Sequence, residues 1–376
     1  MLGFVRGHTF NIYSVPTPSP SNSCRAIDKE QKRTASFLFH SLWDDLLQAM
    51  EGHVLAKKEP PMIRFQTARP VGLMTAAIAV VLVACGLQAA DRPEITFSDA
   101  RIFPESLTST KNGDLFFGSL GLDAVYRATS KSAQATPWIS AKSNGLTTVL
   151  GVFADEKAGV LWVCSSASGG RRGAPYVGET ALKAFKLSDA SLKGSYPFPG
   201  NGLCNDIAVA KDGTVYATDT NMGRVLRLKK GASALDVWAE DAMVLATADG
   251  IALLADGQVY VNSVGQGTLM RIPVKADGSA GPIVKLETSR PMMGPDGMRS
   301  VGNKTLLVVE GGRLDEVTIN GDKAEVKVLK EGMTGITAVT LTGGMAYVAE
   351  ARLNLRNDTT KDPGPFRAMG IPYKAK

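Results

Sequence analysis

Histidine is nearly absent from this 376-residue chain, and its three copies, His8, His40 and His53, all lie near the start. Residues 91–376 therefore lack the side chain on which most zinc and copper sites depend. They also lack the base of a serine–histidine triad and any other histidine general base. Hydrolytic chemistry in this part of the chain would have to rest on carboxylates and a metal ion.

Cysteine is scarce as well. Of four cysteines, Cys24 and Cys85 precede residue 91, and Cys164 and Cys204 fall in different repeats with no Cys-x-x-Cys spacing. A structural disulfide would be permitted in an exported protein. We expect instead that Cys164 and Cys204 are two buried free thiols, because unpaired cysteine commonly packs as a small apolar residue.

Charge of one sign is not gathered anywhere. The formal net charge is +6, and nine basic and six acidic residues in positions 1–85 leave a surplus of only three positive charges for residues 86–376. A nucleic-acid-binding protein normally shows a concentrated basic patch or stripe. No nucleic-acid partner is expected.

Glycine, with 39 copies, is plentiful and marks the turns of a repeated β-hairpin. In Leu203–Thr220 an alternating run, the turn Asp212-Gly213 and a second alternating run follow one another, and Asp-Gly tolerates the positive φ angles of a tight turn. The second strand of this hairpin occurs six times in the chain, once here and five times elsewhere. The copies are Leu115–Ser119, Leu161–Ser165, Val215–Asp219, Val259–Ser263, Leu306–Glu310 and Ala346–Glu350.

The first residues of these copies are 46, 54, 44, 47 and 40 positions apart. This is the period of a four-stranded propeller blade, and a single blade cannot bury both faces, so the blades must close into a ring. The sequence predicts an all-β fold, a six-bladed β-propeller with four-stranded blades over residues 91–376. The expected blades are 101–140, 147–199, 203–241, 247–288, 294–332 and 335–373.

Two further strands should complete the ring. Glu94–Phe97 precedes the first repeat and is expected to pair with the last blade, and Phe366–Ile371 is expected in the tail. Helices longer than a turn or two are not expected after residue 91. Blade 2 carries an insertion, 167–179, whose Arg171-Arg172 pair we interpret as part of a solvated loop.

Residues 1–61 show no blade repeat and only a short helical pattern at Ala35–Met50. We interpret them as a disordered or non-native extension, with Met62 as the natural start. Residues 62–90 are typical of a signal peptide, because the basic residues Arg64 and Arg69 precede the small and apolar run 72–84. The predicted location is outside the cytoplasm, in the periplasm or anchored to the membrane.

The end of this signal segment leaves alternatives open. Leu82-Val-Ala-Cys85 resembles a bacterial lipoprotein signal, in which Cys85 would become the acylated first residue. An ordinary signal cleaved near Ala89 or Ala90, or an uncleaved anchor, also fits, although the run is shorter than the roughly 20 residues of a spanning helix. A lipid at Cys85 would be the protein's only membrane contact.

Polar residues recur at one level of the predicted innermost strands. Ten positions before each repeated strand stand Glu105, Gly151, Asn205, Asp249, Asp296 and Ile336, which we call the polar ring. The shared register should turn them toward the central channel. Asx-Gly pairs can also be simple turn formers, but four acidic or amide residues in register favour a site.

Converging carboxylates repel one another unless protons or a cation lie among them. The all-oxygen set Glu105, Asn205, Asp249 and Asp296 suits a hard divalent cation, and Ca²⁺ accepts irregular oxygen ligands completed by water. The sequence therefore predicts a divalent metal site, with Ca²⁺ expected first and Mg²⁺ or Mn²⁺ as alternatives.

Four short motifs resemble those of the senescence-marker-protein, gluconolactonase and luciferin-regenerating-enzyme family. They are Phe103-Pro-Glu-Ser106, Leu203-Cys-Asn-Asp206, Asp249-Gly-Ile-Ala252 and Pro295-Asp-Gly-Met298. The resemblance covers about residues 95–350 and implies a six-bladed propeller with a catalytic divalent ion in its channel.

By this resemblance Glu105, Asn205, Asp249 and Asp296 would be metal ligands. Asp296 would also be the catalytic acid or base, and Asp206 would contact the substrate or support a ligand. Two positions depart from the family: Asp249 stands where Asn is common, and Leu203 stands where sugar-lactone hydrolases carry Arg. The implied activity is hydrolysis of a lactone or ester less polar than a sugar lactone.

The ends of the second strands should return to the level of the polar ring. These residues are Ser119, Ser165, Asp219, Ser263, Glu310 and Glu350, with Asn221 and Asn262 close by. Some could contact a substrate, but we expect each to satisfy its own loop.

Two other functions remain open, because fold alone does not give function. One is a non-catalytic, exported propeller that binds a ligand or serves as an interaction scaffold. The other is a metal-free propeller similar to strictosidine synthase, which Asp219-Thr220 and Gly223-Arg224-Val225 resemble faintly. The protein is expected to act as a monomer.

Overall fold

The computed structural model describes residues 92–167, 177–200 and 202–375. The segments 1–61 and 62–90 and the pair Arg171-Arg172, on which sequence predictions were made, lie outside these residues. Strands β1 to β25 make up almost all the regular structure, and the described helical segments η2 (Ser143–Gly145) and η4 (Leu353–Leu355) are single 3₁₀ turns. The expectation of an all-β domain without long helices is confirmed.

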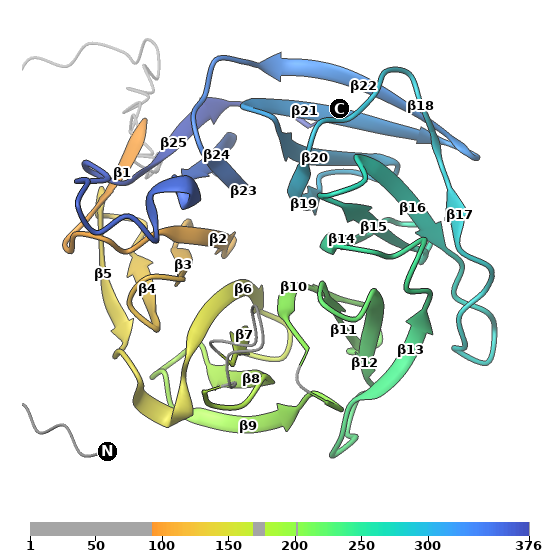
Figure 1. Cartoon of the computed structure of the whole chain (residues 1–376), viewed down its shortest axis with the longest axis horizontal. Helices are drawn as coiled ribbons and strands as arrows, with labels where there is room; N and C mark the ends of the chain where they lie inside the picture. The colour runs from red at the N-terminus through yellow and green to blue at the C-terminus, as the bar shows by residue number, and fades with distance from the viewer. Residues whose placement is uncertain (1–91, 168–176, 201, 376) are drawn as a thin grey trace, which may run out of the picture. The chain divides into compact units, whose positions relative to one another are not determined.

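The strands form five hydrogen-bonded sheets, one of which joins two blades, and Figure 1 shows them arranged around a common axis. Each innermost strand contacts the innermost strand of the next blade, and the contacts run around the whole ring. Blades 1 to 3 are regular four-stranded meanders. Their strands are β2 (Pro104–Ser109), β3 (Leu115–Ser119), β4 (Ala124–Ala128) and β5 (Gln134–Ile139); β6 (Thr148–Asp155), β7 (Val160–Ser166), β8 (Ala181–Lys186) and β9 (Leu192–Pro197); and β10 (Cys204–Val209), β11 (Val215–Asp219), β12 (Arg224–Leu228) and β13 (Asp236–Glu240).

Blades 4 to 6 follow the same plan, with one extra edge strand in blade 5. Their strands are β14 (Ala248–Leu253), β15 (Val259–Ser263), β16 (Thr268–Ile272) and β17 (Val284–Lys285); β19 (Pro295–Ser300), β20 (Thr305–Glu310), β21 (Arg313–Asn320) and β22 (Lys323–Lys330), with β18 (Glu287–Thr288) parallel to β22; and β23 (Ile336–Thr342), β24 (Met345–Glu350) and β25 (Arg367–Pro372).

The start of the described chain closes the ring. Strand β1 (Glu94–Phe97) pairs antiparallel with β25 and becomes the outermost strand of blade 6. The same strand also pairs parallel with β5, so that blades 1 and 6 share one eight-stranded sheet. The predicted closing strand and the predicted tail strand are both confirmed.

Apolar side chains fill the spaces between neighbouring blades. Between blades 3 and 4, Tyr216 and Trp238 pack edge to face with ring centroids 4.7 Å apart, beside Ile251 and Val261. Burying one such large side chain is worth roughly 1.5–3 kcal/mol. The blade repeat thus encodes the core, since each blade offers an apolar face only to its neighbours.

Neighbouring blades are also tied by side chains near the end of the second strand. The Thr218 hydroxyl of blade 3 donates to the Asp249 carbonyl of blade 4 at 2.6 Å. The Asn262 amide of blade 4 donates to the Asp296 carbonyl of blade 5, also at 2.6 Å. Thr218 and Asn262 are each the fourth residue of the repeated second strand. A side chain at this fourth position therefore points at the innermost strand of the following blade.

Cys164 occupies the same position in blade 2, and it forms a disulfide with Cys204 on the innermost strand of blade 3. The Cα atoms are 5.1 Å apart, within the usual range for a disulfide. The prediction of two free thiols was wrong. Residues 40 positions apart are brought together because the second strand of one blade faces the first strand of the next.

No helix in the described part of the chain is long and apolar enough to cross a membrane.

Candidate functional site

Every innermost strand has a β-bulge near its first residues. In blade 3 the pairing of β10 with β11 skips from Cys204 to Ile207, which leaves Asn205 and Asp206 out of the ladder. The other five shifts fall at Pro104/Ser106, Val149/Val152, Ala248/Ile251, Pro295/Met298 and Ile336/Ala338. A bulge re-aims side chains that a regular strand would send to alternate faces. The six bulges therefore create one common level at which side chains turn into the channel.

Four of these bulges follow a residue in the left-handed region. Phe103 has φ 46°, Thr247 has φ 55°, and Gly294 and Gly335 have φ 60°. Each lies two positions before a bulge residue. A positive φ is unfavourable for Phe and for β-branched Thr, costing about 1–3 kcal/mol, and such strain is found mainly where the surrounding structure requires it.

The bulge residues enclose a small cavity at the centre of the ring. It leaves about 10 Å³ for the centre of a water molecule, which is room for roughly one water. The lining residues are Glu105, Ser106, Asn205, Asp206, Asp249, Asp296, Gly297, Thr337 and Ala338. All four residues predicted as ligands, and Asp206, are thus brought together.

Two predicted members of the polar ring do not line this cavity. Ile336 packs in the apolar core with Val339 and Val348, and Thr337 takes its place at the cavity. The turn between β23 and β24 is one residue shorter than the corresponding turns of blades 1, 3, 4 and 5. Counting ten residues back from Ala346 therefore reaches Ile336, one position before the bulge residue Thr337. Gly151 instead allows close packing, because a Cβ there would lie 2.2 Å from the Asn205 carbonyl oxygen.

Burial and mutual repulsion raise the pKa values of three carboxyl groups of the cavity. Burial raises the pKa of Glu105 well above its usual range, and the negative charges of Asp249 and Asp206 raise it further. Burial likewise raises the pKa of Asp296, with added repulsion from Asp249 and Glu105. For Asp249, burial raises the pKa to about 7, although a hydrogen bond from Asn205 opposes the shift.

Asn205 holds the cavity together through its side-chain amide. Its Nδ2 donates to Asp249 Oδ2 at 2.9 Å and to the Thr220 hydroxyl at 3.0 Å. Thr220 in turn donates to the Ala248 carbonyl at 2.6 Å. The amide is therefore fixed in position by two neighbouring blades before any ligand binds.

Arg299 was missed by the sequence analysis. Its guanidinium donates to Asp206 Oδ2 at 2.7 Å, and both side chains are buried. It also donates to the carbonyls of Leu107 and Val152, at 3.3 and 3.2 Å, on the innermost strands of blades 1 and 2. One cation from blade 5 thus crosses the channel and contacts three other blades. The signal available in the sequence was a single arginine on a predicted innermost strand.

The residues of the cavity fit a hard cation. If all four carboxyls were ionised, their charge would exceed that of Arg299 by three. The buried atoms Glu105 Oε2, Asp206 Oδ1 and Asp249 Oδ1 have no hydrogen-bond partner. Across 92–167, 177–200 and 202–375, however, no three His, Cys, Asp or Glu side chains are arranged to hold a metal ion by themselves. A bound cation would therefore also need Asn205 and water.

The ends of the second strands prove to be structural. Ser119 donates to the Ile102 carbonyl at 2.8 Å, and Asp219 accepts from the Leu203 amide and from Arg224. Ser165, Ser263, Glu310 and Glu350 are similarly bonded to loops or arginines. The six strand-end residues thus satisfy nearby loops and arginines, as expected, whereas Asn262 bonds to the Asp296 carbonyl of the next blade.

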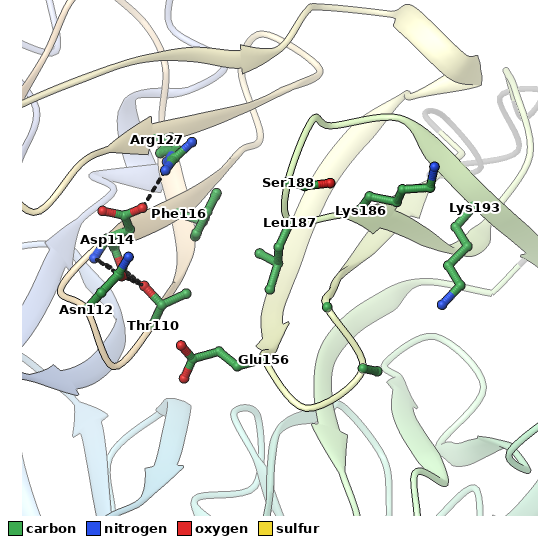
Figure 2. Close-up of a pocket in the computed structure, with 12 residues that line it drawn as sticks. Thr110, Asn112, Asp114, Phe116, Arg127, Glu156, Lys186, Leu187, Ser188 and Lys193 are labelled. Carbon is green, nitrogen blue, oxygen red and sulfur yellow. Dashed lines mark hydrogen bonds and ion pairs between the residues drawn. The ribbon is translucent and has the colours of Figure 1, made fainter.

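A wider depression lies between blades 1 and 2, away from the channel (Figure 2). It contains the ion pair of Arg127 with Asp114, and Glu156 accepts from the Lys111 amide at 3.1 Å. Arg127, Asp114 and Glu156 thus already have hydrogen-bond or ion-pair partners. None of the polar-ring residues lines this depression.

No protein-family model matches the chain, and no curated protein sequence matches it either. Solved structures do match. The allergen Mala s 1 of Malassezia sympodialis has a TM-score of 0.57 and 13% identity, covering 74% of this chain and 95% of that one. A gluconolactonase from Xanthomonas campestris has a TM-score of 0.54 and 16% identity, covering 74% and 89%. A luciferin-regenerating enzyme has a TM-score of 0.53 and 16% identity, covering 74% and 94%.

These similarities show a shared propeller fold, as the resemblance of the four motifs implied. The neighbours include both enzymes and an allergen, so the fold by itself does not select an activity.

Proposed function

We propose that this protein is an exported, metal-dependent hydrolase that opens a lactone or an ester at the mouth of the propeller channel. The observation that carries the proposal is the convergence of Glu105, Asn205, Asp249 and Asp296 on one water-sized cavity. Buried carboxylates with unpartnered oxygens are costly unless they serve a ligand or a proton transfer.

Glu105, Asn205, Asp249 and Asp296 would hold the divalent cation, most simply Ca²⁺, with Mg²⁺ or Mn²⁺ as alternatives. When bound, such an ion supplies Lewis acidity that polarises a carbonyl and stabilises the negative charge developing on its oxygen. The hydrogen bonds from Asn205 orient Asp249 in advance, which reduces the reorganisation needed during the reaction.

Asp296 is the proposed general base. Among the acidic residues of the cavity, Asp296 is the one that is not fully buried, so part of this residue is open to solvent. The raised pKa of its carboxyl suits a group that takes a proton from water and returns it to the departing alkoxide. Asp206 is held by Arg299 and positions the cavity, with Oδ1 available to a bound group.

The Cys164–Cys204 disulfide supports export, because disulfides persist mainly in oxidising compartments. It agrees with the signal segment at 62–90, and Cys85 would be the acylated residue if the protein is a lipoprotein. The protein is proposed to act as a monomer in the periplasm or at its membrane.

The test is calorimetric titration of Ca²⁺ into metal-stripped protein, together with hydrolysis of chromogenic lactones and aryl esters. Binding of one ion and metal-dependent hydrolysis, both lost in Asn205→Ala and Asp296→Ala, would support the proposal. Ser188→Ala, far from the channel, is the matched control. Full activity in both channel variants would refute the assigned site.

A non-catalytic scaffold is the second candidate. Two observations favour it. Among the described residues, no three His, Cys, Asp or Glu side chains are arranged to hold a metal ion by themselves. Arg299 also already offsets part of the negative charge of the cavity. Ca²⁺ binding without hydrolysis of any lactone or ester would favour this alternative.

A further inference from the structure

The cavity in the channel admits little more than one water-sized group. Arg299 closes the channel on one side by bonding to the carbonyls of Leu107 and Val152, which lie further along their strands than the polar ring. Most of any substrate must therefore rest outside, at the end of the ring where the innermost strands begin. We call this the mouth end.

Exposed large apolar side chains are distributed unevenly over the propeller. Among the described residues nine are exposed, and six of them lie in loops at the mouth end: Val177, Met222, Met243, Val244, Met293 and Leu353. The remaining three, Leu192, Val237 and Val328, lie on the fourth strands of their blades, β9, β13 and β22. Exposed apolar groups gathered on one surface commonly mark a binding site.

Four of these side chains lie on loops of blades 3 to 5 that contact one another. We call Met222, Met243, Val244 and Met293 the apolar arc. The exposed fractions of Met243 and Met293 are 78% and 65%.

Backbone contacts join the loops that carry the apolar arc. The Asp241 amide donates to the Gly223 carbonyl at 3.1 Å, and the Gln266 side chain donates to the Met243 carbonyl at 2.7 Å. A Cβ on Gly267 would lie 2.3 Å from the Met292 carbonyl oxygen, so the third loop is equally close. Met293 is also fixed in position, because its amide donates to Glu310 Oε2, at the end of β20, at 2.8 Å.

A membrane is a poor candidate for the occupant of the arc. The described chain starts at the opposite end, where Arg92 donates to the carbonyls of Gly113, Thr129 and Ser132. The described residues thus enter the propeller at the end away from the apolar arc. Four side chains also offer far less than the roughly 1,000 Å² that a stable protein interface needs.

We propose that the apolar arc binds an unbranched alkyl chain of the substrate while its ester or lactone carbonyl enters the cavity. The substrate class would be medium-chain acyl esters or alkyl-substituted lactones. This inference rests on the proposed hydrolase function. Three of the four side chains are methionines, which are flexible and adapt to chains of different length.

The test compares p-nitrophenyl acetate with p-nitrophenyl octanoate, using the wild type and a Met243→Gln/Met293→Gln double variant. For octanoate we expect the double variant to raise KM about tenfold. For acetate, kcat/KM should stay within twofold, because the ring residues are untouched. Leu192→Gln/Val237→Gln is the matched control, since these side chains are exposed on outermost strands.

A second readout does not need catalysis. Titration with sodium decanoate should show binding to the wild type that is lost in the arc variant and kept in the control. If no ester is hydrolysed but decanoate binding depends on the arc, the hydrolase proposal fails and the apolar site stands. Equal kcat/KM for acetate and octanoate, arc-dependent binding to phosphatidylcholine vesicles, or an arc-dependent dimer would overturn the inference.

Discussion

The guanidinium of Arg299 donates to the carboxylate of Asp206 at 2.7 Å, and this ion pair joins blades 5 and 3 across the propeller channel. The pair is buried beside a cavity that already holds three other carboxyl groups. Arg299 thus offsets part of the negative charge that the channel accumulates.

Replacing Arg299 by Met should lower the free energy of unfolding by about 3–5 kcal/mol, because it leaves a buried carboxylate without its partner. Urea denaturation at pH 7 would measure the loss. An Asp206→Asn/Arg299→Met double variant should recover part of it, since neither charge is then left alone. Equal stability of the single and double variants would show that the pair is not coupled.

The metal-free protein should lose stability as the pH rises. Burial raises the pKa of Asp249 to about 7, above the 3.8 of an ordinary aspartate, so the folded state holds a proton that the unfolded state releases. This stabilisation is complete below about pH 4 and disappears as the pH passes 7. Glu105 and Asp296 act in the same direction because burial raises their pKa values as well.

Melting temperatures in the presence of a chelator, measured at pH 5 and pH 8, would check this dependence. Asp249→Asn should reduce the difference between the two pH values, and Asp322→Asn, at an exposed position in blade 5, should not. A melting temperature that rises from pH 5 to pH 8 without metal would contradict the prediction.

Loss of the disulfide should destabilise the propeller. Cys164 and Cys204 lie 40 positions apart and join blades 2 and 3, and removing a native disulfide typically costs about 2–5 kcal/mol. Denaturation of a Cys164→Ala/Cys204→Ala variant would show the effect. Adding a reductant should lower the stability of the wild type and leave the double variant unchanged.

Gly151→Ala should disturb both stability and the cavity. The added Cβ would lie 2.2 Å from the Asn205 carbonyl oxygen, so the bulge of blade 3 must shift. We expect a loss of about 1–3 kcal/mol from this overpacking and weaker Ca²⁺ binding. Gly302→Ala is the control, because its nearest neighbours would be 3.9 Å away and its stability should change little.

Much of the fold could be read from the sequence, because a propeller repeats one local pattern. The hairpin turns, the six repeated strands, the closing strand Glu94–Phe97 and the tail strand each follow from alternating residues and Gly-containing turns. These are short-range features, and each blade carries its own copy. The gathering of Glu105, Asn205, Asp249 and Asp296 followed from the same register.

The errors arose where spacing along the chain differs from position in space. Ile336 was placed one position away from the true bulge residue, Thr337, because the hairpin of blade 6 is shorter by one residue. Cys164 and Cys204 showed no pairing signal, since only the packing of one blade on the next brings them together.

The sequence by itself thus determined the blade count, the closure of the ring and four of the residues that line the channel cavity, Glu105, Asn205, Asp249 and Asp296. The tertiary structure alone decided the charge balance of the channel, through Arg299, and the covalent link between blades 2 and 3. The reason is physical: strand periodicity is a local property of the chain, whereas an ion pair across a channel depends on residues that only the closed ring makes neighbours.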